Sequence, residues 1–520
     1  MTTTLDELPA DVETCHQLIR ELLESLAQQT HLSEKLQHQL EQLLRQRYGR
    51  KTETLDPAQL LLFAREILAA EETTAPESTP STDTPPTEDS SSPPKKKGHG
   101  RKPLPASLPR KREIHDVPGE QLPCPDCGTL RIRIGEEIRE QLEYVPASLI
   151  VIQHVRPKYA CKACEGNIVI GERLPEPIEK GLPGPGLLAQ VAVSKYADHL
   201  PLYRQEGIFR RHGVELPRQT TCDWMAVIAD LLEPIWKVMH RLVLQSQVVQ
   251  SDDTTVTVLD PVLGRFVGRL WVYLGDCFHP YVVYHFTENR SGDGPQEMLS
   301  GYQGYLQADA YSGYDALYTS GKIREVGCWM HARRKFYEAR TSDPPRAHQA
   351  LAWIRMLYKI EEEATKKKLD DAQRHALRQE KSRPILTKLK EWLDQQTFLP
   401  KSPIGEAIGY ALNHWVALER YLEAGFLEID NGASERAVKP VAIGRKNWLF
   451  AGSKAGGKTA AILMSLCTTC KNLNIDPLAY LTDVLGRIST HPARLIEELL
   501  PDRWQALREA AALVEADQAD

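Results

Sequence analysis

Apolar residues at helical spacing mark the first predicted element. Residues 11–47 follow the 3-4 spacing of a coiled-coil seam, with polar Gln29 and Ser33 at its centre. The apolar seam positions are Ile19, Leu22, Leu26, Leu36, Leu40 and Leu43. Such a seam buries its apolar surface only against another helix, which favours self-association as a homodimer or higher oligomer. A single amphipathic helix packed on its own domain would give the same pattern.

The residue pattern of 185–240 also predicts helices. Gly213 lies between two amphipathic segments, and LPRQTTCDW places Thr220 and Thr221 near a helix start. This arrangement resembles a helix-turn-helix, a fold that places its second helix in the DNA major groove. Helices that only pack against the rest of the protein would fit equally well.

From Ser246 the pattern changes to strands. The runs QVVQSDDTTVTVLD, RLWVYLGD and YVVYHFTENR are followed by a short helix, GPQEMLSGY, then by the strand YLQADAY and finally by IREVGCWMHARRKF. With a further helix before that last strand, this is the element order of an α/β sheet of the ribonuclease-H-like type. Asp252 lies in the first strand and Asp309 at the end of the fourth, so we expect them side by side on adjacent central strands.

A third acidic residue comes much later. Residues 340–420 form a predicted charged helical insertion, most of whose charge we expect on a solvated face, and Glu435 follows on a predicted helix that includes residues 433–442. Three carboxylates from distant parts of a chain make chemical sense if they hold two divalent ions, Mg²⁺ or Mn²⁺. Each acid alone could instead be a capping or ion-paired residue. Asp253 should point to the opposite face of the strand, away from the metals.

Basic residues are clustered. The linker over residues 70–94 is rich in Pro, Ser and Thr and is predicted to be disordered. A dense basic arm follows, for which contacts to DNA phosphates are favoured over a solvated tail. Arg445 and Lys446, with Trp448, form a second group suited to phosphates and bases. The cations of the arm are Lys95, Lys96, Lys97, Arg101, Lys102, Arg110, Lys111 and Arg112.

Two C-x-x-C pairs, Cys124/Cys127 and Cys161/Cys164, flank a segment with strand-like alternation. Four thiolates in this spacing predict a zinc ribbon with a structural Zn²⁺ and no open catalytic position, in preference to a disordered or redox segment. Cys467 and Cys470 share the spacing but lie in an apolar helical run, so we expect them in the core.

Composition indicates the size of the hydrophobic core and the cellular compartment. Hydrophobic residues make up 42% of the 520 residues, enough for a substantial core. The chain has no signal-peptide pattern and no long apolar run, and its cysteines suit a reducing compartment, so we expect a cytoplasmic protein with no membrane partner. The family resemblance described below implies that this cytoplasm is bacterial and that the protein is nucleoid-associated when bound to DNA. The net charge of −6 says little, because the cations are clustered.

Two further motifs have competing interpretations. Residues 452–459, GSKAGGKT, match the P-loop pattern G-x-x-x-x-G-K-[ST]. The sequence beyond them is mainly helical and lacks the parallel strands of a nucleotide-binding fold, so a loop capping a helix is favoured over ATP binding. His331, placed at the end of the last predicted strand, is either an accessory catalytic residue or a structural histidine.

Several motifs together resemble those of the large transposase of the insertion-sequence-sixty-six family, a group of bacterial DDE transposases. The matching runs are LLRQRYGRKTE, GHGRKPLP, CPDCG with PKYACKAC, SKYADHLPLYRQE, SDDT with GRLWVY, LQADAYSGY, CWMHARRKF and GRKNWLFAGS. The resemblance implies a ribonuclease-H-like domain with Asp252, Asp309 and Glu435 as the catalytic triad, and DNA breakage and joining at element ends. It also implies small accessory proteins as partners. Where the family more often has Asp-Glu-Thr-Pro, this chain has Asp-Asp-Thr-Thr from Asp252 on.

The expected organisation is therefore a DNA transposase in several parts. A catalytically inactive DNA-binding protein, or a P-loop ATPase assisting a separate recombinase, are the alternatives. The predicted parts are an oligomerisation region (1–69), a linker with the basic arm (70–115), a zinc ribbon (116–175), a helical region with a candidate helix-turn-helix (176–245), the catalytic domain (246–480) and a helical tail (481–520).

Overall fold

The computed structural model describes residues 181–519 without a break, and shorter stretches before them. None of the helices in this described part is both long enough and apolar enough to cross a membrane. The earlier described positions are 13, 15–17, 19–26, 29, 32–33, 36, 149, 151–152, 158–159, 169–170 and 176–178.

The described positions between 13 and 36 are all helical, as the seam pattern predicts. Ile19, Leu22, Leu26 and Leu36 are between 52% and 67% exposed, so these seam positions are not buried against the described residues. Pairing with a second helix stays a prediction. Leu40 and Leu43 lie outside the described residues.

A five-stranded sheet forms the centre of the folded body, in the order β5-β4-β3-β6-β7. The first three strands in sequence are antiparallel neighbours, and β6 and β7 run parallel to β3. The predicted order of strands and helices is confirmed, with helices α6 and α7 on either side of β6. The elements are β3 (Val248–Asp260), β4 (Gly264–Leu274), β5 (Val282–Thr287), α6 (Asp293–Met298), β6 (Gly304–Gln307), α7 (Asp315–Tyr318) and β7 (Ile323–Val326).

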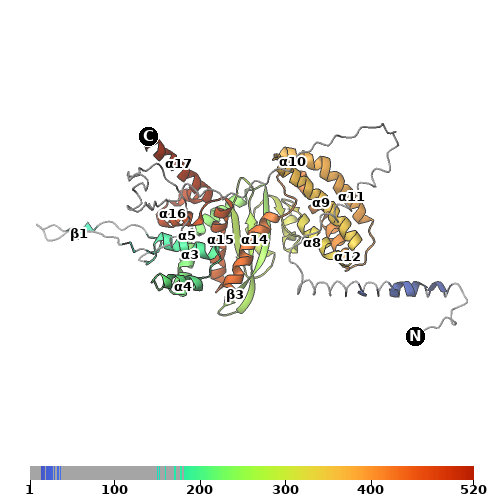
Figure 1. The fold of residues 1–520 in the computed structure, drawn as a ribbon, viewed down its shortest axis with the longest axis horizontal. Coiled ribbons are helices and arrows are strands. Elements are labelled where there is room, and N and C mark those ends of the chain that lie inside the picture. The colour runs from blue at the N-terminus through green and yellow to red at the C-terminus, as the bar shows by residue number, and fades with distance from the viewer. Residues whose placement is uncertain are drawn as a thin grey trace, which may run out of the picture. The chain divides into compact units, whose positions relative to one another are not determined.

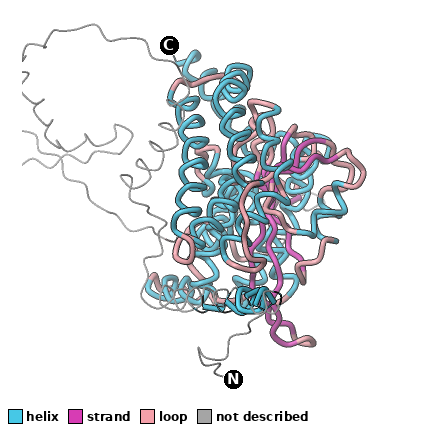
Figure 2. The backbone as a smooth tube through the Cα atoms, turned by 90° about the vertical axis from the view of Figure 1, so that its right-hand side faces the viewer, coloured by secondary structure: helices cyan, strands magenta, loops and turns pink. Residues whose placement is uncertain are grey.

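Helices from both ends of the described body pack around the sheet (Figure 1, Figure 2). The α5 helix packs on α15 and β5, while α14 lies against β3 and β4. The predicted pair of helices flanking Gly213 is present, and Gly213 has the positive φ of 79° that a residue without a Cβ adopts freely. These helices are α3 (Pro185–Tyr196), α4 (Leu202–Arg211), α5 (Arg218–Val243), α14 (Gly432–Trp448), α15 (Lys454–Asn472), α16 (Pro477–Arg487) and α17 (Pro501–Ala519).

Helix α15 covers the edge of the sheet that β5 forms. The hydroxyls of Ser465 and Thr469 accept hydrogen bonds from the β5 amides of Tyr284 (2.8 Å) and Val282 (3.0 Å). These bonds satisfy backbone donors that an edge strand would otherwise present to other chains. Gly457 permits the close approach, because a Cβ there would lie 2.7 Å from the ring of Phe286.

The predicted insertion, residues 340–420, is helical. It shares a second hydrophobic core with the helix before it and with the edge of the sheet, and this core includes Trp329, Phe336 and Leu351. The strand expected to extend through His331 ends instead at Val326, and α8 begins at Trp329, since Trp329, Ala332 and Phe336 recur at helical spacing and are all buried. The helices are α8 (Trp329–Ala339), α9 (Pro344–Lys366), α10 (Asp371–Leu377), a π-helical turn (Arg378–Ser382), α11 (Arg383–Asp394), α12 (Pro403–Asn413) and α13 (Trp415–Glu419).

Candidate active site

Asp252 and Asp309 come from neighbouring strands at the centre of the sheet. The parallel ladder pairs Val248 with Tyr305 and Gln250 with Gln307. Continued by two residues, the same register sets Asp252 beside Asp309, which follows the end of β6. The sequence predicted this adjacency because its element order indicated a ribonuclease-H-like sheet, in which these two positions lie side by side.

Glu435 lies in the first turn of α14, and the start of that helix is bonded to β3 next to Asp252. Asn431 Nδ2 and Ser434 Oγ each donate to the Ser251 carbonyl, both at 3.4 Å. The Ser434 amide donates to Gln250 Oε1 at 3.3 Å. Asn431 and Ser434 are fully buried, so these contacts fix the helix start against the strand that carries Asp252.

The three acids share one electrostatic environment. Burial raises the pKa of the Asp252 carboxyl to about 7, and the nearby charges of Asp309 and Glu435 act in the same direction. Burial also raises the pKa of Asp309, which the Arg290 guanidinium partly offsets. A divalent cation is the kind of ligand that would relieve this repulsion, and its preferred ligands are carboxylate oxygens. The residues present therefore fit such an ion.

Asp253 has cationic partners of its own. Its carboxylate accepts from Arg269 Nη1 at 2.8 Å, and from Arg290 Nε and Nη2 at 3.0 and 2.8 Å. Arg290 Nη2 also lies 3.5 Å from Asp309 Oδ2. Asp253 is thus linked to Asp309 through Arg290. The expectation that the Asp253 side chain points away from the metals did not include this link.

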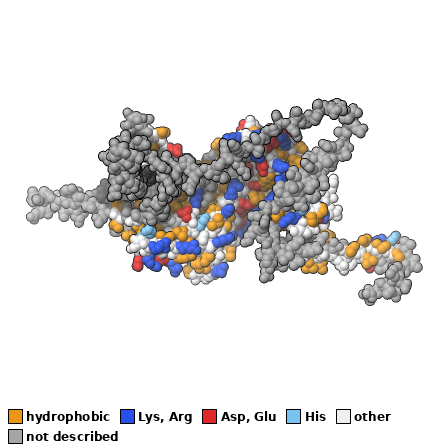
Figure 3. All heavy atoms as spheres, in the orientation of Figure 1, with side chains coloured by type: hydrophobic (Ala, Val, Ile, Leu, Met, Phe, Trp, Pro, Cys, Tyr) orange, Lys and Arg blue, Asp and Glu red, His pale blue; other side chains and the backbone are white. Residues whose placement is uncertain are grey.

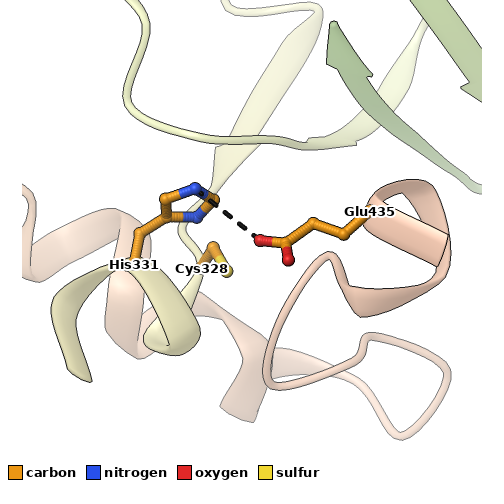
Figure 4. A group of neighbouring side chains, drawn as sticks. All are labelled: Cys328, His331 and Glu435. Carbon is orange, nitrogen blue, oxygen red and sulfur yellow. Dashed lines mark ion pairs between the residues drawn. The ribbon is translucent and has the colours of Figure 1, made fainter. Parts of the chain in front are cut away.

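His331 and Cys328 lie beside Glu435 (Figure 4). His331 Nε2 is 3.7 Å from Glu435 Oε1, and Arg334 Nη2 is 3.7 Å from Oε2. Burial lowers the pKa of His331, which the Glu435 carboxylate partly offsets, and burial raises the pKa of the Cys328 thiol to about 12. Among the described residues, Cys328, His331 and Glu435 form the group whose donor atoms meet within 4.8 Å, and Asp252 and Asp309 are not part of it.

The basic group at the end of α14 is partly engaged within the protein. Arg445 Nη1 donates to Thr254 Oγ1 at 3.0 Å, and to the carbonyl and Oγ1 of Thr255 at 2.7 and 2.6 Å. Trp448 is half-buried against the core, whereas Lys446 is exposed. Arg445 therefore holds α14 against β3, and Lys446 is the cation of this pair that faces solvent.

The Gly-rich turn caps a helix, the interpretation favoured on its sequence context. Ser453 Oγ accepts from the Gly456 amide at 3.0 Å at the start of α15, and Lys454 pairs with Glu288 at 2.7 Å. Lys458 is exposed. Cys467 and Cys470, further along α15, are buried in the core as predicted.

Two predicted groups lie outside the described residues. These are the four ribbon cysteines, Cys124, Cys127, Cys161 and Cys164, and the basic arm from Lys95 to Arg112. Within the described body, α4 and the start of α5 carry further exposed cations, and Figure 3 shows Lys and Arg side chains gathered in this region. The exposed arginines there are Arg204, Arg210, Arg211 and Arg218.

Sequence reasoning did not include Arg269, Arg290, Arg334 or Cys328 in the site. Cys328 had a local signal, because Cys and His at the spacing C-x-x-H place two ligand types close together when a helix begins between them. No local signal marked the arginines, whose partners are 16 to 101 positions away; the nearest pair is Arg269 with Asp253.

Comparison with known protein families accounts for most of the chain. The model described as "Transposase IS66 family" matches residues 180–459, which include all three acids. The chain belongs to the IS66 transposase family. Further IS66-related models match residues 122–165 (zinc-finger binding domain of transposase IS66), 35–112 (transposase C of IS166 homeodomain) and 465–501 (IS66 C-terminal element). The zinc-finger match spans all four ribbon cysteines and supports a structural zinc there.

Similar chains occur in Sinorhizobium fredii. The uncharacterized protein y4hP is 34% identical over 448 residues, covering 80% of this chain and 79% of that one. The uncharacterized protein y4qI is 39% identical over 426 residues, covering 77% and 78%. The resemblance to the IS66 family inferred from motifs is confirmed.

Proposed function

We propose that this IS66-family chain is a DDE transposase that cleaves DNA at the ends of an insertion sequence and joins the ends to target DNA. The observation that carries the proposal is the convergence of Asp252, Asp309 and Glu435, from two adjacent strands and a helix bonded to one of them. The sheet order and the strand directions support a ribonuclease-H-like catalytic domain.

Asp252, Asp309 and Glu435 would hold two divalent ions, which supply activation of the attacking oxygen and charge stabilisation at the leaving 3′-oxygen. Asp252 is central, since its carboxyl interacts with the charges of both other acids. The contacts of Asn431 and Ser434 keep Glu435 in position across a long insertion. Arg290 holds Asp253 and reaches Asp309, so it orients one acid and partly neutralises another.

His331 is proposed as an accessory residue at the Glu435 side of this group, where its ring lies 3.7 Å from the carboxylate.

The decisive experiment is cleavage of a duplex bearing the element's own end. We expect cleavage to depend on Mg²⁺ or Mn²⁺ and not on ATP. Cleavage that required ATP would favour the nucleotide-binding alternative for residues 452–459.

Metal-free protein should show a pH signature of Asp252. Its folded pKa of about 7 lies above the unfolded value near 4, so between these values the native state holds a proton that the unfolded state has lost. The contribution of Asp252 to the free energy of unfolding therefore falls as the pH rises through this window, by up to about 4 kcal/mol.

Thermal unfolding of wild type and of Asp252→Asn at pH 5 and pH 8 measures this contribution of Asp252 to the free energy of unfolding. We expect wild type to lose more stability than the variant on going to pH 8, and added Mg²⁺ to restore the difference. Equal losses in the two proteins would mean that Asp252 ionises normally.

DNA binding should depend steeply on salt through the basic arm. Replacing Lys95, Lys96 and Lys97 by Gln should lower the slope of log K against log salt by about 0.9 for each phosphate that these lysines neutralise in the wild-type complex. A matched control exists in Lys366, Lys367 and Lys368, a second run of three lysines in the helical insertion. Binding isotherms at several salt concentrations would show the idea to be wrong if both triple variants behaved alike.

A further inference from the structure

Cys328, His331 and Glu435 converge from two separate parts of the chain. Cys328 directly precedes α8, His331 lies in the first turn of that helix, and Glu435 lies in the first turn of α14. Their Sγ, ring-nitrogen and carboxylate donor atoms all lie within 4.8 Å of one another. Figure 4 shows the imidazole and the thiol on one side and the carboxylate reaching toward them from the other.

Two polar atoms of this cluster have no hydrogen-bond partner. Within the described part of the chain, His331 Nδ1 and Glu435 Oε1 are buried atoms without a hydrogen-bond partner. The 3.7 Å between His331 Nε2 and Glu435 Oε1 is too long for a hydrogen bond. Cys328 is 1% exposed. Buried polar atoms are normally satisfied, so atoms left in this state point to a missing ligand.

The two carboxylate oxygens of Glu435 have different neighbours. Oε2 faces Arg334, whose side chain is 42% exposed, and Oε1 faces His331. The contact of His331 with Glu435 is thus to Oε1, the carboxylate oxygen on the side of the cluster.

We propose that Cys328, His331 and Glu435 form a binding site for a borderline divalent ion, with Zn²⁺ as the ion of this class that the site fits. One sulfur, one nitrogen and one oxygen ligand match the donor types of protein zinc sites, and three protein ligands leave a fourth position open. Mg²⁺ prefers oxygen ligands alone, which the cluster does not offer. The ion bound by the Cys328–His331–Glu435 cluster would thus differ in kind from the Mg²⁺ or Mn²⁺ ions that the three acids would hold.

This inference rests on the proposed function only through Glu435, which belongs to both groups. Binding of Zn²⁺ would form bonds from the metal to sulfur, nitrogen and oxygen and would release the thiol proton to solvent. Zn²⁺ bound here would also engage the carboxylate of the third catalytic acid, so excess Zn²⁺ should compete with Mg²⁺ for that residue.

The test is the zinc content of the full chain after dialysis, measured by elemental analysis. We expect about two zinc ions per chain in wild type, one of them in the ribbon, and about one in Cys328→Ala and in His331→Ala. Cys470→Ala is the matched control, because it removes a buried cysteine outside the cluster and should keep both ions. A wild-type chain with about one zinc ion, or variants that keep two, would overturn the proposal.

Cobalt spectroscopy provides a second readout that does not rely on a folded Cys328 variant. In a chain with Cys124→Ser and Cys127→Ser, added Co²⁺ should give the thiolate charge-transfer absorption of a site with one sulfur, and His331→Ala should weaken or abolish it. If the chain with Cys124→Ser and Cys127→Ser shows no such absorption with Co²⁺, the proposed cluster site is wrong.

The Asp252→Asn and Asp309→Asn variants separate this inference from the proposed function. Both should keep about two zinc ions while losing DNA cleavage. Wild-type protein that cleaves DNA with Mg²⁺ but holds only the ribbon zinc would overturn the cluster site and leave the DDE assignment intact.

Discussion

Substituting any of the three acids should reduce DNA cleavage at least about 100-fold, because Asp252→Asn, Asp309→Asn and Glu435→Gln each remove a charged metal ligand while nearly preserving shape. Each ion would stabilise charge in the in-line transition state, so the loss should appear in the cleavage rate. DNA binding should survive, since we expect it to rest mainly on the zinc ribbon and the basic arm. The measurement is single-turnover cleavage of an end-bearing duplex, with binding followed separately.

The control for this series is Asp260→Asn at the end of the same strand. Asp260 accepts hydrogen bonds from the amides of Val262 and Leu263, which asparagine can also accept. Asp253→Asn is a poor control, because its buried carboxylate balances Arg269 and Arg290 and its loss would release Arg290 toward Asp309. Full cleavage by any one of the three triad variants would remove that residue from the proposed site.

The strand order could be predicted from the sequence because it depends on local patterns. Strand-like runs and turns give the order of strands and helices along the chain. The Asp252–Asp309 adjacency was expected from the ribonuclease-H-like sheet that this order indicated. The buried positions of Cys467 and Cys470 were likewise readable from an apolar helical run.

The errors came where a local pattern was ambiguous or a partner was distant. The run after Ile323 is apolar enough for a strand, and only the spacing of Trp329, Ala332 and Phe336 reveals that a helix begins there. Arg445 stays a predicted DNA contact, but the sequence did not reveal its partners within the protein, Thr254 and Thr255, which lie 191 and 190 positions away in the chain. Such pairings are set by the tertiary fold, which a charge pattern does not encode.

The charged insertion shows the same limit. Most of its charge was expected on a solvated face, and the completely buried Arg378 is an exception that the charge pattern did not reveal. Its guanidinium forms two hydrogen bonds to Glu361, at 2.9 and 2.8 Å, and Nη1 donates to the carbonyls of Tyr421 and Ala424 at 2.9 and 2.7 Å. One arginine thus joins α9 and the π-helical turn to the segment that leads toward Glu435.

Arg378→Met should therefore destabilise the protein by about 3–5 kcal/mol, since it leaves Glu361 as a nearly buried, uncompensated charge. The double variant Arg378→Met/Glu361→Leu should recover much of this loss, because it removes both charges together. Lys366→Met is the control, as Lys366 and Glu362 form an exposed surface pair at 3.8 Å whose loss should cost less than about 0.5 kcal/mol. Thermal and denaturant unfolding measure these differences.

The effect on cleavage should follow from where the insertion lies in the chain. It connects α8, which carries His331, to α14, which carries Glu435, so loosening it should misplace the third acid relative to Asp252. We expect Arg378→Met to lose cleavage activity at a lower temperature than it loses DNA binding. A variant that unfolded like wild type would show that the Arg378–Glu361 pair is energetically neutral and that the apolar core alone holds the insertion together.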